Sequence, residues 1–178
     1  MSAPPFPNGQ STNKQSGETP SLAMAIEVRR FLKTEAPADF ELALALRTSV
    51  FIEEQGIPPE LEYDEFDEQS THWLLIDPVT LQPMATGRVL PYQEACQARP
   101  VAKLGRIAVS SSYRGQRLGQ RLMGELLTHV QQAGYEQAIL DAQTRVMPFY
   151  EKLGFVKEGF EFMEADIPHY RMRLVFKP

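Results

Sequence analysis

The segment from Lys103 to Val130 constrains the fold of this chain most, because it predicts a strand, a polar turn and a helix in direct succession. The turn before the helix carries Arg114, Gly115, Arg117 and Gly119. The first turn of a helix leaves backbone N–H groups without partners and bears a partial positive charge, so it binds anions readily. The glycines permit a close approach to the backbone, and the arginines add full positive charge. This segment therefore predicts a binding site for a phosphate or pyrophosphate group.

The first residues of the chain differ in composition from the rest. Residues 1–24 are rich in Pro, Ser, Asn, Gln, Gly and Thr. Such a segment buries too little apolar surface to offset the loss of chain entropy on folding. We therefore expect a disordered tail over 1–24 and a single domain over 25–178, a length that suffices for a full hydrophobic core.

The apolar pattern in the first half of this domain predicts a strand, a helix and a hairpin. The stretch IEVRRFLK is typical of a strand, and Asp39 is expected to be the N-cap of a helix that runs to about Gln55. An acidic run follows, and then two strands that are joined around Asp77-Pro78.

The second half of the domain alternates strands and helices before it ends in a second hairpin. After the segment 103–130, Gly134 is expected to end the helix, and AILDAQ predicts a strand that is buried on both faces. The stretch MPFYEKLG predicts a short helix, and the remaining residues predict two paired strands. The whole pattern indicates an α/β (α+β) fold with a mixed sheet and helices on both faces.

Composition argues against several classes of protein. The formal net charge of −5 argues against a general nucleic-acid binder, which needs a clustered positive surface. The only cysteine is Cys96, so no disulfide can form within the chain, which fits a reducing, cytoplasmic compartment. No apolar run approaches the ~18 residues of a membrane span, and the N-terminus lacks the basic start and apolar stretch of a secretory signal. We expect neither nucleic acid nor a membrane as a partner.

Three motifs in sequence order resemble the GCN5-related N-acetyltransferase (GNAT) family, whose members transfer an acetyl group from acetyl-CoA to an amine. They are LGRIAVSSSYRGQRLG, ILDAQ and FYEKLGF. A finer set of features is similar to the ElaA-like branch of that family, and it adds RTSVFIEEQGIP, the acidic run ending in Asp67, His72 and DIPHYRM. The resemblance covers the chain from about residue 26 to residue 176.

The resemblance implies a fold and an activity. The fold would be the GNAT acyl-CoA N-acyltransferase fold, a mixed, mostly antiparallel sheet in which the parallel strands LGRIAV and AILDAQ splay apart. The activity would be acetyl transfer (EC 2.3.1.-) with acetyl-CoA as cosubstrate, no metal, and an amine of a small molecule or a protein as acceptor. The chain would be a monomer or a homodimer.

The resemblance also implies where CoA would bind. The diphosphate would lie over the amides of Arg114 to Gly119, and the backbone of Ile107 and Val109 would pair with the pantetheine amides like an added strand. The expected CoA-binding residues are Ile107, Ala108, Val109, Arg114, Gly115, Gln116, Arg117, Leu118, Gly119, Gln120, Gln143, Phe149 and Tyr150.

Arg117 departs from the family pattern, which has a glycine at this position of the phosphate turn. A side chain is tolerable there if the backbone stays helical and the arginine points outward. The arginine either hinders the approach of the diphosphate or adds a charge contact to the nucleotide phosphates.

Acetyl transfer requires a neutral amine and a proton for the leaving thiolate. An alkyl ammonium has a pKa near ~10.4, so it must lose a proton before it attacks the thioester. By resemblance, Tyr150 is the expected proton donor, since a phenol keeps its proton at neutral pH. The alternative for Tyr150 is a core tyrosine packed beside Phe149 and Phe155. The backbone N–H of Val109 is the expected donor to the oxyanion.

The general base is expected among carboxylates and histidines. Asp64 and Asp67 match the branch pattern, and His72 and His169 are the other candidate catalytic residues. The alternatives are a solvated acidic face, which would also attract an ammonium substrate, and structural histidines. Arg47 and Arg88 remain open between binding an acidic part of the substrate and forming buried ion pairs with these carboxylates.

Other chemistries find little support in the residues. The histidines and the cysteine lack the spacing of a zinc site, and the acidic run lacks the central glycine of a calcium loop, so no metal is expected. The turn does not match GxxxxGK[ST], which argues against a nucleotide hydrolase. A CoA-binding sensor or scaffold without transfer activity remains the alternative function.

Overall fold

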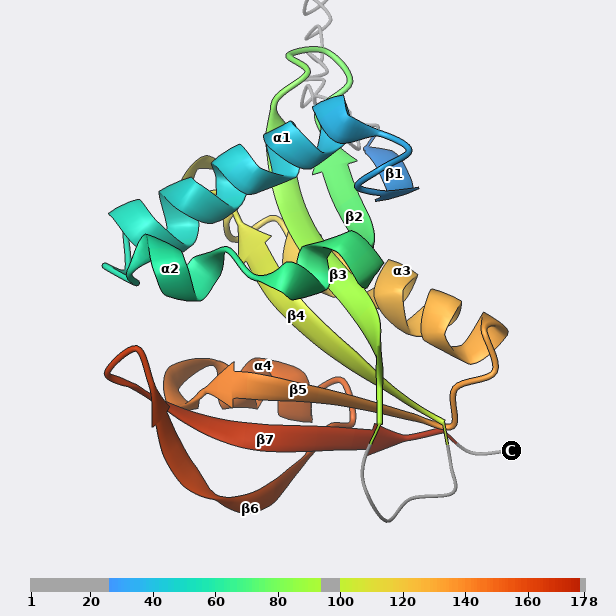
Figure 1. Cartoon of the computed structure of the whole chain (residues 1–178), viewed down its shortest axis with the longest axis vertical. Coiled ribbons are helices and arrows are strands. Elements are labelled where there is room, and N and C mark those ends of the chain that lie inside the picture. The colour runs from blue at the N-terminus through green and yellow to red at the C-terminus, as the bar shows by residue number, and fades with distance from the viewer. Residues whose placement is uncertain (1–25, 94–99, 177–178) are drawn as a thin grey trace, which may run out of the picture.

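The sheet at the centre of the molecule has seven strands in the order β1-β2-β3-β4-β5-β7-β6 (Figure 1). The computed structural model describes residues 26–93 and 100–176, so the expected disordered tail over 1–24 and Cys96 lie outside the described residues. The strands are β1 (Glu27–Leu32), β2 (Thr71–Ile76), β3 (Pro83–Tyr92), β4 (Val101–Val109), β5 (Gln137–Gln143), β6 (Val156–Glu164) and β7 (Ile167–Val175).

One pair of strands, β4 and β5, is parallel, and this pair splays apart. The two strands pair only where Val101–Lys103 lies beside Gln137–Ile139. Beyond these residues β4 continues to Val109 and β5 to Gln143 without pairing to each other. The other neighbouring strands are antiparallel. The predicted mixed, mostly antiparallel sheet with a splayed parallel pair is therefore confirmed.

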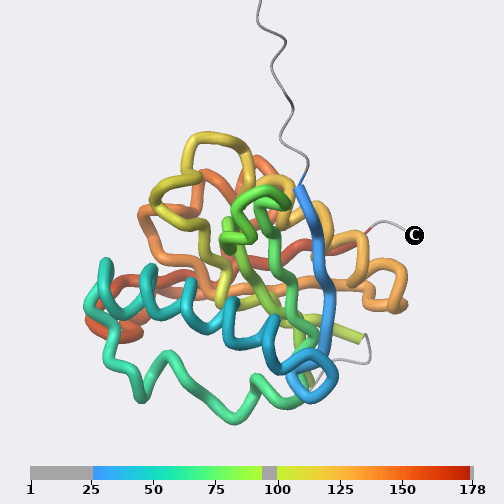
Figure 2. Tube along the Cα trace, turned by 90° about the horizontal axis from the view of Figure 1, so that it is seen from above, coloured from blue at the N-terminus to red at the C-terminus, as the bar shows by residue number. Residues whose placement is uncertain are grey.

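Helices cover both faces of the sheet. α1 (Pro37–Arg47) and α2 (Pro59–Glu62) lie in front of the strands in Figure 1, whereas α3 (Leu118–Gln132) and α4 (Met147–Glu151) lie behind them. The view from above shows α1 and α3 on opposite sides of the strands (Figure 2). The first four residues of β5 are all buried, so both faces of this strand are covered near its start, as its apolar sequence predicted.

The hydrophobic core has a layer on each side of the sheet. On one side the apolar stripe of α3 packs against the sheet around Trp73 and Leu104. On the other side Phe40 and Ala43 of α1 pack against Phe31 and Leu74. A helix with apolar residues at a 3.6-residue period buries one face, which explains why α3 lies flat on the strands. The buried residues of α3 are Leu118, Leu122, Met123, Leu126 and Val130.

The first helix begins earlier than expected, and Asp39 is not its N-cap. Ala36 occupies the N-cap position and Pro37 the first turn, where its missing N–H costs nothing. Asp39 lies in the first turn and accepts a hydrogen bond from Arg29 Nη1 at 2.6 Å. After Arg47 the helical path continues as a π-helix over Thr48–Glu53, so it ends close to the expected Gln55 but with a wider turn.

The predicted turns agree with the structure. Asp77 Oδ1 accepts a hydrogen bond from the backbone N–H of Val79 at 2.9 Å, and this contact closes the turn between β2 and β3. Gly134 and Gly154 follow α3 and α4 with φ of 82° and 92°, a conformation that favours glycine.

Candidate functional site

A cavity of about 800 Å³ opens at the splayed ends of β4 and β5. Its walls come from both strands, the start of α3, α4, the segment after α1 and the turn between β6 and β7. The cavity lies where the two strands leave backbone groups without a sheet partner, so a ligand that is both long and polar finds acceptors and donors along it.

Most of the expected CoA-binding residues line this cavity. Of the predicted set, only Gln116 is not among the lining residues. The cavity-lining members are Ile107, Ala108, Val109, Arg114, Gly115, Arg117, Leu118, Gly119, Gln120, Gln143, Phe149 and Tyr150.

The turn before α3 contains two residues with positive φ, Gly115 and Arg117, and a third residue, Gly119, that packs against α4. Gly115 has φ of 79°, and an added Cβ there would meet nothing within 4 Å. An added Cβ at Gly119 would lie 3.4 Å from the Phe149 ring, so this glycine lets α3 approach α4 closely. Arg114 donates to Val109 O at 3.1 Å and to Glu54 Oε2 at 2.6 Å.

Arg117 adopts the left-handed conformation, so a helical backbone, one of the two conditions for a tolerable side chain at this position, is not present. Its φ is 61° and its ψ is 17°, and it is the N-cap residue of α3. This conformation favours glycine, because a Cβ crowds the following carbonyl group. The backbone conformation therefore explains why the family pattern has a glycine at this position. The side chain of Arg117 is exposed.

A β-bulge interrupts β4 beside the cavity. Thr86 of β3 pairs with Ala108, and Arg88 pairs with Gly105, so Arg106 and Ile107 together face one residue of β3. Arg106 has φ of 53°, which is unusual for a residue with a side chain. A bulge bends its strand and re-aims the groups beside it, and here it lies beyond Lys103, the last residue of β4 that pairs with β5.

Tyr150 lies in the apolar wall of the cavity. Its side chain is 8% exposed, and its ring makes edge contacts with Phe149 and Phe155 at centroid distances of 5.0 Å and 6.1 Å. Burial raises the pKa of the Tyr150 hydroxyl to about 12. The phenol therefore keeps its proton throughout the neutral range. It is both a core residue and a cavity residue, so the two interpretations of its sequence position are compatible.

His169 and Gln143 lie next to each other across β7 and β5, and both line the cavity. His169 Nδ1 is 2.8 Å from the carbonyl oxygen of Ile167. A carbonyl only accepts hydrogen bonds, so Nδ1 carries the proton, and Nε2 of the neutral ring keeps its lone pair. Gln143 donates to Gln55 Oε1 at 2.7 Å, which bridges the gap between β5 and the segment after α1.

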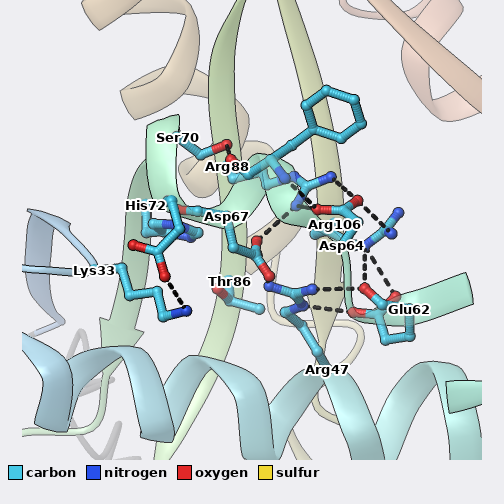
Figure 3. A network of polar contacts seen from close by, with 12 residues as sticks. Lys33, Arg47, Glu62, Asp64, Asp67, Ser70, His72, Thr86, Arg88 and Arg106 are labelled. Carbon is cyan, nitrogen blue, oxygen red and sulfur yellow. Dashed lines mark hydrogen bonds and ion pairs between the residues drawn. The ribbon is translucent and has the colours of Figure 1, made fainter. Parts of the chain in front are cut away.

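Asp64, Asp67 and His72 do not line the cavity. The two carboxylates form ion pairs with arginines (Figure 3). Burial acts to raise the pKa of both carboxyl groups, but the hydrogen bonds and charges of Arg47, Arg88 and, for Asp64, Arg106 outweigh burial and lower it.

His72 is fully enclosed beside these carboxylates. It is 1% exposed, its Nε2 is 2.9 Å from the carbonyl oxygen of Asp67, and its ring stacks on Phe31. Burial lowers the pKa of His72 more than the nearby Asp67 raises it, so the ring is neutral at physiological pH.

Arg47 and Arg88, which the sequence left open, form buried ion pairs with the acidic run. Arg47 is 1% exposed and contacts Glu62 and Asp67, and Arg88 is 5% exposed and contacts Asp64 and Asp67. The resulting cluster is closed to a substrate on the side of α1, because the helix covers it (Figure 3).

Sequence reasoning missed several polar residues of the cavity wall. Glu54 and Gln55 follow the π-helix, and Glu164 and Arg145 lie at the other side of the mouth. Glu54 and Gln55 belong to the motif RTSVFIEEQGIP, which carries the resemblance to the ElaA-like branch. That motif could have indicated that these two residues belong to the site. Nothing in the local sequence marks Arg145 or Glu164.

The described residues contain neither a metal-binding cluster nor a membrane-spanning helix. Over residues 26–93 and 100–176, no three His, Cys, Asp or Glu side chains gather in a way that could hold a metal ion. No helix in this part of the chain has the length and apolar character needed to cross a membrane.

Comparison with known proteins identifies the family of this chain. The family described as acetyltransferase (GNAT) domain matches residues 79–176. The uncharacterized N-acetyltransferase YjcF of Bacillus subtilis is 35% identical over 131 residues, which is 73% of this chain and 88% of that protein. The uncharacterized protein YyaT of the same organism is 38% identical over 138 residues, which is 76% of this chain and 88% of that protein. The chain belongs to the GNAT acetyltransferase family.

Solved structures support the same assignment and the finer branch. Escherichia coli ElaA superimposes with a TM-score of 0.72 at 27% identity, covering 84% of this chain and 99% of that chain. An acyl-CoA N-acyltransferase from Pseudomonas aeruginosa superimposes with a TM-score of 0.73 at 28% identity, with the same coverage. The predicted likeness to the ElaA-like branch is confirmed, and the chain is an acyltransferase of a family that uses acyl-CoA.

Proposed function

We propose that this chain transfers an acetyl group from acetyl-CoA to a primary amine by direct attack, with Tyr150 as general acid. The observation that carries the proposal is one cavity of about 800 Å³ that joins the turn at 114–119 to Tyr150 between the splayed strands. The acceptor is the amine of a small molecule or of a protein, and the chain acts as a monomer or a homodimer.

The cofactor is proposed to lie along the opening strand. Backbone N–H groups of the turn at 114–119 would hold the diphosphate, and Arg114 and Arg117 would add charge. The backbone of Ile107 and Val109 would pair with the pantetheine amides. This placement would direct the thioester toward Tyr150, which lines the same cavity.

The proposed reaction moves two protons. The amine lone pair forms the new C–N bond at the thioester carbonyl, and the N–H of Val109 stabilises the oxyanion. Collapse of the intermediate breaks the C–S bond, and the Tyr150 hydroxyl gives its proton to the departing thiolate. The proton lost by the amine is accepted at His169 Nε2, directly or through water.

His169 is the proposed base because it alone of the four predicted base candidates lines the cavity. Its Nδ1–H is held by the carbonyl of Ile167, which leaves Nε2 as the acceptor. Asp64 and Asp67 instead form ion pairs with arginines, and His72 forms a hydrogen bond with the backbone of Asp67. We therefore propose no direct role in proton transfer for these three residues.

The test is CoA release from acetyl-CoA across a panel of amines, together with calorimetric binding of acetyl-CoA. We expect binding without an amine and faster thiol release with at least one amine. Failure to bind acetyl-CoA combined with no stimulated release overturns the proposal.

One observation favours a second function, a CoA-binding sensor or scaffold without transfer activity. Arg117 occupies a left-handed position of the phosphate turn where glycine is preferred, so this turn departs from the family pattern. Tight CoA binding with no turnover, and no effect of Tyr150→Phe on any measured property of the complex, would support the sensor instead.

A further inference from the structure

Six buried or half-buried charged side chains close into a ring on the α1 side of the sheet. Three arginines and three carboxylates alternate around it, so each arginine bridges two carboxylates and each carboxylate bridges two arginines (Figure 3). We call this group the ion ring, and its members in order are Arg47, Glu62, Arg106, Asp64, Arg88 and Asp67.

Every link of the ion ring has hydrogen-bonding length. The N–O distances in ring order are 2.5 Å for Arg47–Glu62, 3.0 Å for Glu62–Arg106, 2.9 Å for Arg106–Asp64, 2.6 Å for Asp64–Arg88, 2.6 Å for Arg88–Asp67 and 2.9 Å for Asp67–Arg47. The three positive and three negative charges balance, so the ring as a whole is neutral.

The ion ring joins segments that are distant in the sequence. It contains residues of α1, α2, the acidic run, β3 and β4. Arg47, Glu62, Asp67 and Arg88 are 5% exposed or less. Burying charges carries a desolvation penalty that can cancel their attraction, so apolar side chains would hold these segments together equally well. The ring is therefore better explained by the geometry it imposes than by stability alone.

The geometry that the ring imposes is centred on Arg106, the residue at the bulge of β4. Besides its two carboxylate partners, Arg106 donates to the carbonyl oxygens of Leu61 at 2.9 Å and Glu62 at 3.1 Å. Its backbone has φ of 53°, and such strain persists only where the surroundings determine it. Both Arg106 and Glu62 line the cavity, so the ring forms part of its wall.

We propose that the ion ring positions the β4 bulge, and that Arg106 is a positioning residue for the backbone of Ile107–Val109 along which acyl-CoA is read. This inference rests on the proposed function, because it concerns the backbone groups that hold the pantetheine and the oxyanion. It assigns to the acidic run and its arginines a role through the backbone of β4, with no contact to the reacting atoms.

The test compares Asp64→Asn with Asp39→Asn. The first substitution removes one carboxylate charge from the ring and leaves Arg88 and Arg106 with one carboxylate partner each. The second removes the charge from the Arg29–Asp39 pair, which has an N–O distance of 2.6 Å and does not line the cavity. Because misplacing a reacting group by about 1 Å can slow a reaction about 100-fold, we expect Asp64→Asn to lower kcat about 10- to 100-fold. Asp39→Asn is expected to leave kcat unchanged.

Arg106→Lys provides a second variant in case Asp64→Asn fails to fold. Lysine keeps the charge but loses the planar fork that reaches two carbonyl groups and two carboxylates at once. We expect the same loss of kcat, with cooperative unfolding retained. Hydrogen exchange of the backbone amides of 104–109 is the second readout, and it needs no substrate. We expect faster exchange there in both ring variants than in Asp39→Asn.

A wild-type kcat in a folded ring variant overturns the inference, and so does unchanged exchange of 104–109. If the wild-type protein neither binds nor turns over acyl-CoA, the proposed function fails instead. The exchange measurement alone then decides whether the ring holds the bulge.

Discussion

Tyr150 packs in the core and is also the proposed general acid. It is 8% exposed between two phenylalanine rings, and burial raises the pKa of its hydroxyl to about 12. A hydroxyl with that pKa is a poor source of protons on its own. In the proposed reaction it would donate to a thiolate that forms next to it, and a strongly basic thiolate can take a proton from such a hydroxyl.

We expect Tyr150→Phe to lower kcat about 100- to 10,000-fold, the range for loss of a general acid, while acyl-CoA still binds. Steady-state kinetics with an active amine measure this change. Tyr135→Phe is the control, because Tyr135 packs against the core and does not line the cavity. In the wild-type protein, tyrosine ionisation should not reduce the rate until the pH approaches 12. Equal kcat values for the two variants would contradict the proposed role.

Arg117 is strained in the same way as Arg106, but among residues 26–93 and 100–176 its side chain has no comparable set of partners. A left-handed conformation costs a residue with a Cβ about 1–2 kcal/mol, and glycine avoids this cost while losing more chain entropy on folding. We therefore expect Arg117→Gly to raise the free energy of unfolding by up to ~1 kcal/mol, measured by urea denaturation.

The matched control is Arg121→Gly within α3, four residues further along the chain. Glycine in a helix interior costs about 1 kcal/mol, and this substitution also removes the contact between Arg121 and Glu125, which has an N–O distance of 3.0 Å. The two identical substitutions should change stability in opposite directions. A loss of stability in both would show that the backbone strain at Arg117 is negligible.

At the scale of elements, the ion ring ties a helix, the acidic run and two strands into one unit. Its carboxylates make the unit sensitive to acid. Asp67 has a lowered pKa when folded, so the unfolded chain binds its proton more readily as the pH falls below about 4. The contribution of Asp67 to stability is thus fully present above that pH and is lost as the pH falls.

We expect the free energy of unfolding to fall less steeply between pH 5 and pH 3 in Asp67→Asn than in the wild type, because the variant lacks this titration. Denaturation at a series of pH values measures both curves. Burial raises the pKa of Glu62 and opposes the trend in both proteins, so the difference between the curves isolates Asp67. At neutral pH the variant should be about 3–5 kcal/mol less stable, since Arg47 and Arg88 each lose one of two carboxylate partners and the buried ring keeps an uncompensated positive charge. Parallel curves would contradict the assigned pKa shift.

Across the whole molecule, the splay between β4 and β5 creates the site. The strands pair over three residues each and then diverge, and the cavity opens where the pairing stops. A ligand that fills this gap replaces the missing sheet partner and connects the two halves of the molecule. Its binding should therefore stabilise the folded state as a whole.

We expect CoA at 100 times its Kd to add about 2.7 kcal/mol to the free energy of unfolding, which corresponds to a rise in Tm of about 5 °C or more. Thermal denaturation with and without CoA measures the shift. Gly115→Val is the matched variant, because Gly115 has φ of 79° in the phosphate turn and valine is strained there. The shift should be smaller in this variant. A wild-type Tm that does not respond to CoA would argue against the proposed cavity ligand.

Local patterns predicted the elements well because each pattern follows from a local cause. The apolar stripe of α3, the glycines at 134 and 154, and the turn at Asp77 act through neighbours in the chain. The start of α1 was predicted wrongly because Pro37 and Asp39 are both suited to the beginning of a helix. The structure shows that the Asp39 carboxylate accepts a hydrogen bond from Arg29 of β1 and does not cap the helix.

The sequence by itself determined the family, the mixed sheet and the segment that would hold a phosphate, because these depend on periodicity, on glycine and on motifs in a fixed order. Only the tertiary structure decided which groups the charged residues contact. Arg47, Asp64 and Arg106 are far apart in the chain, and whether such groups meet a substrate or one another depends on how the elements pack. The same is true of Arg117, whose left-handed backbone conformation at the N-cap of α3 only the structure shows.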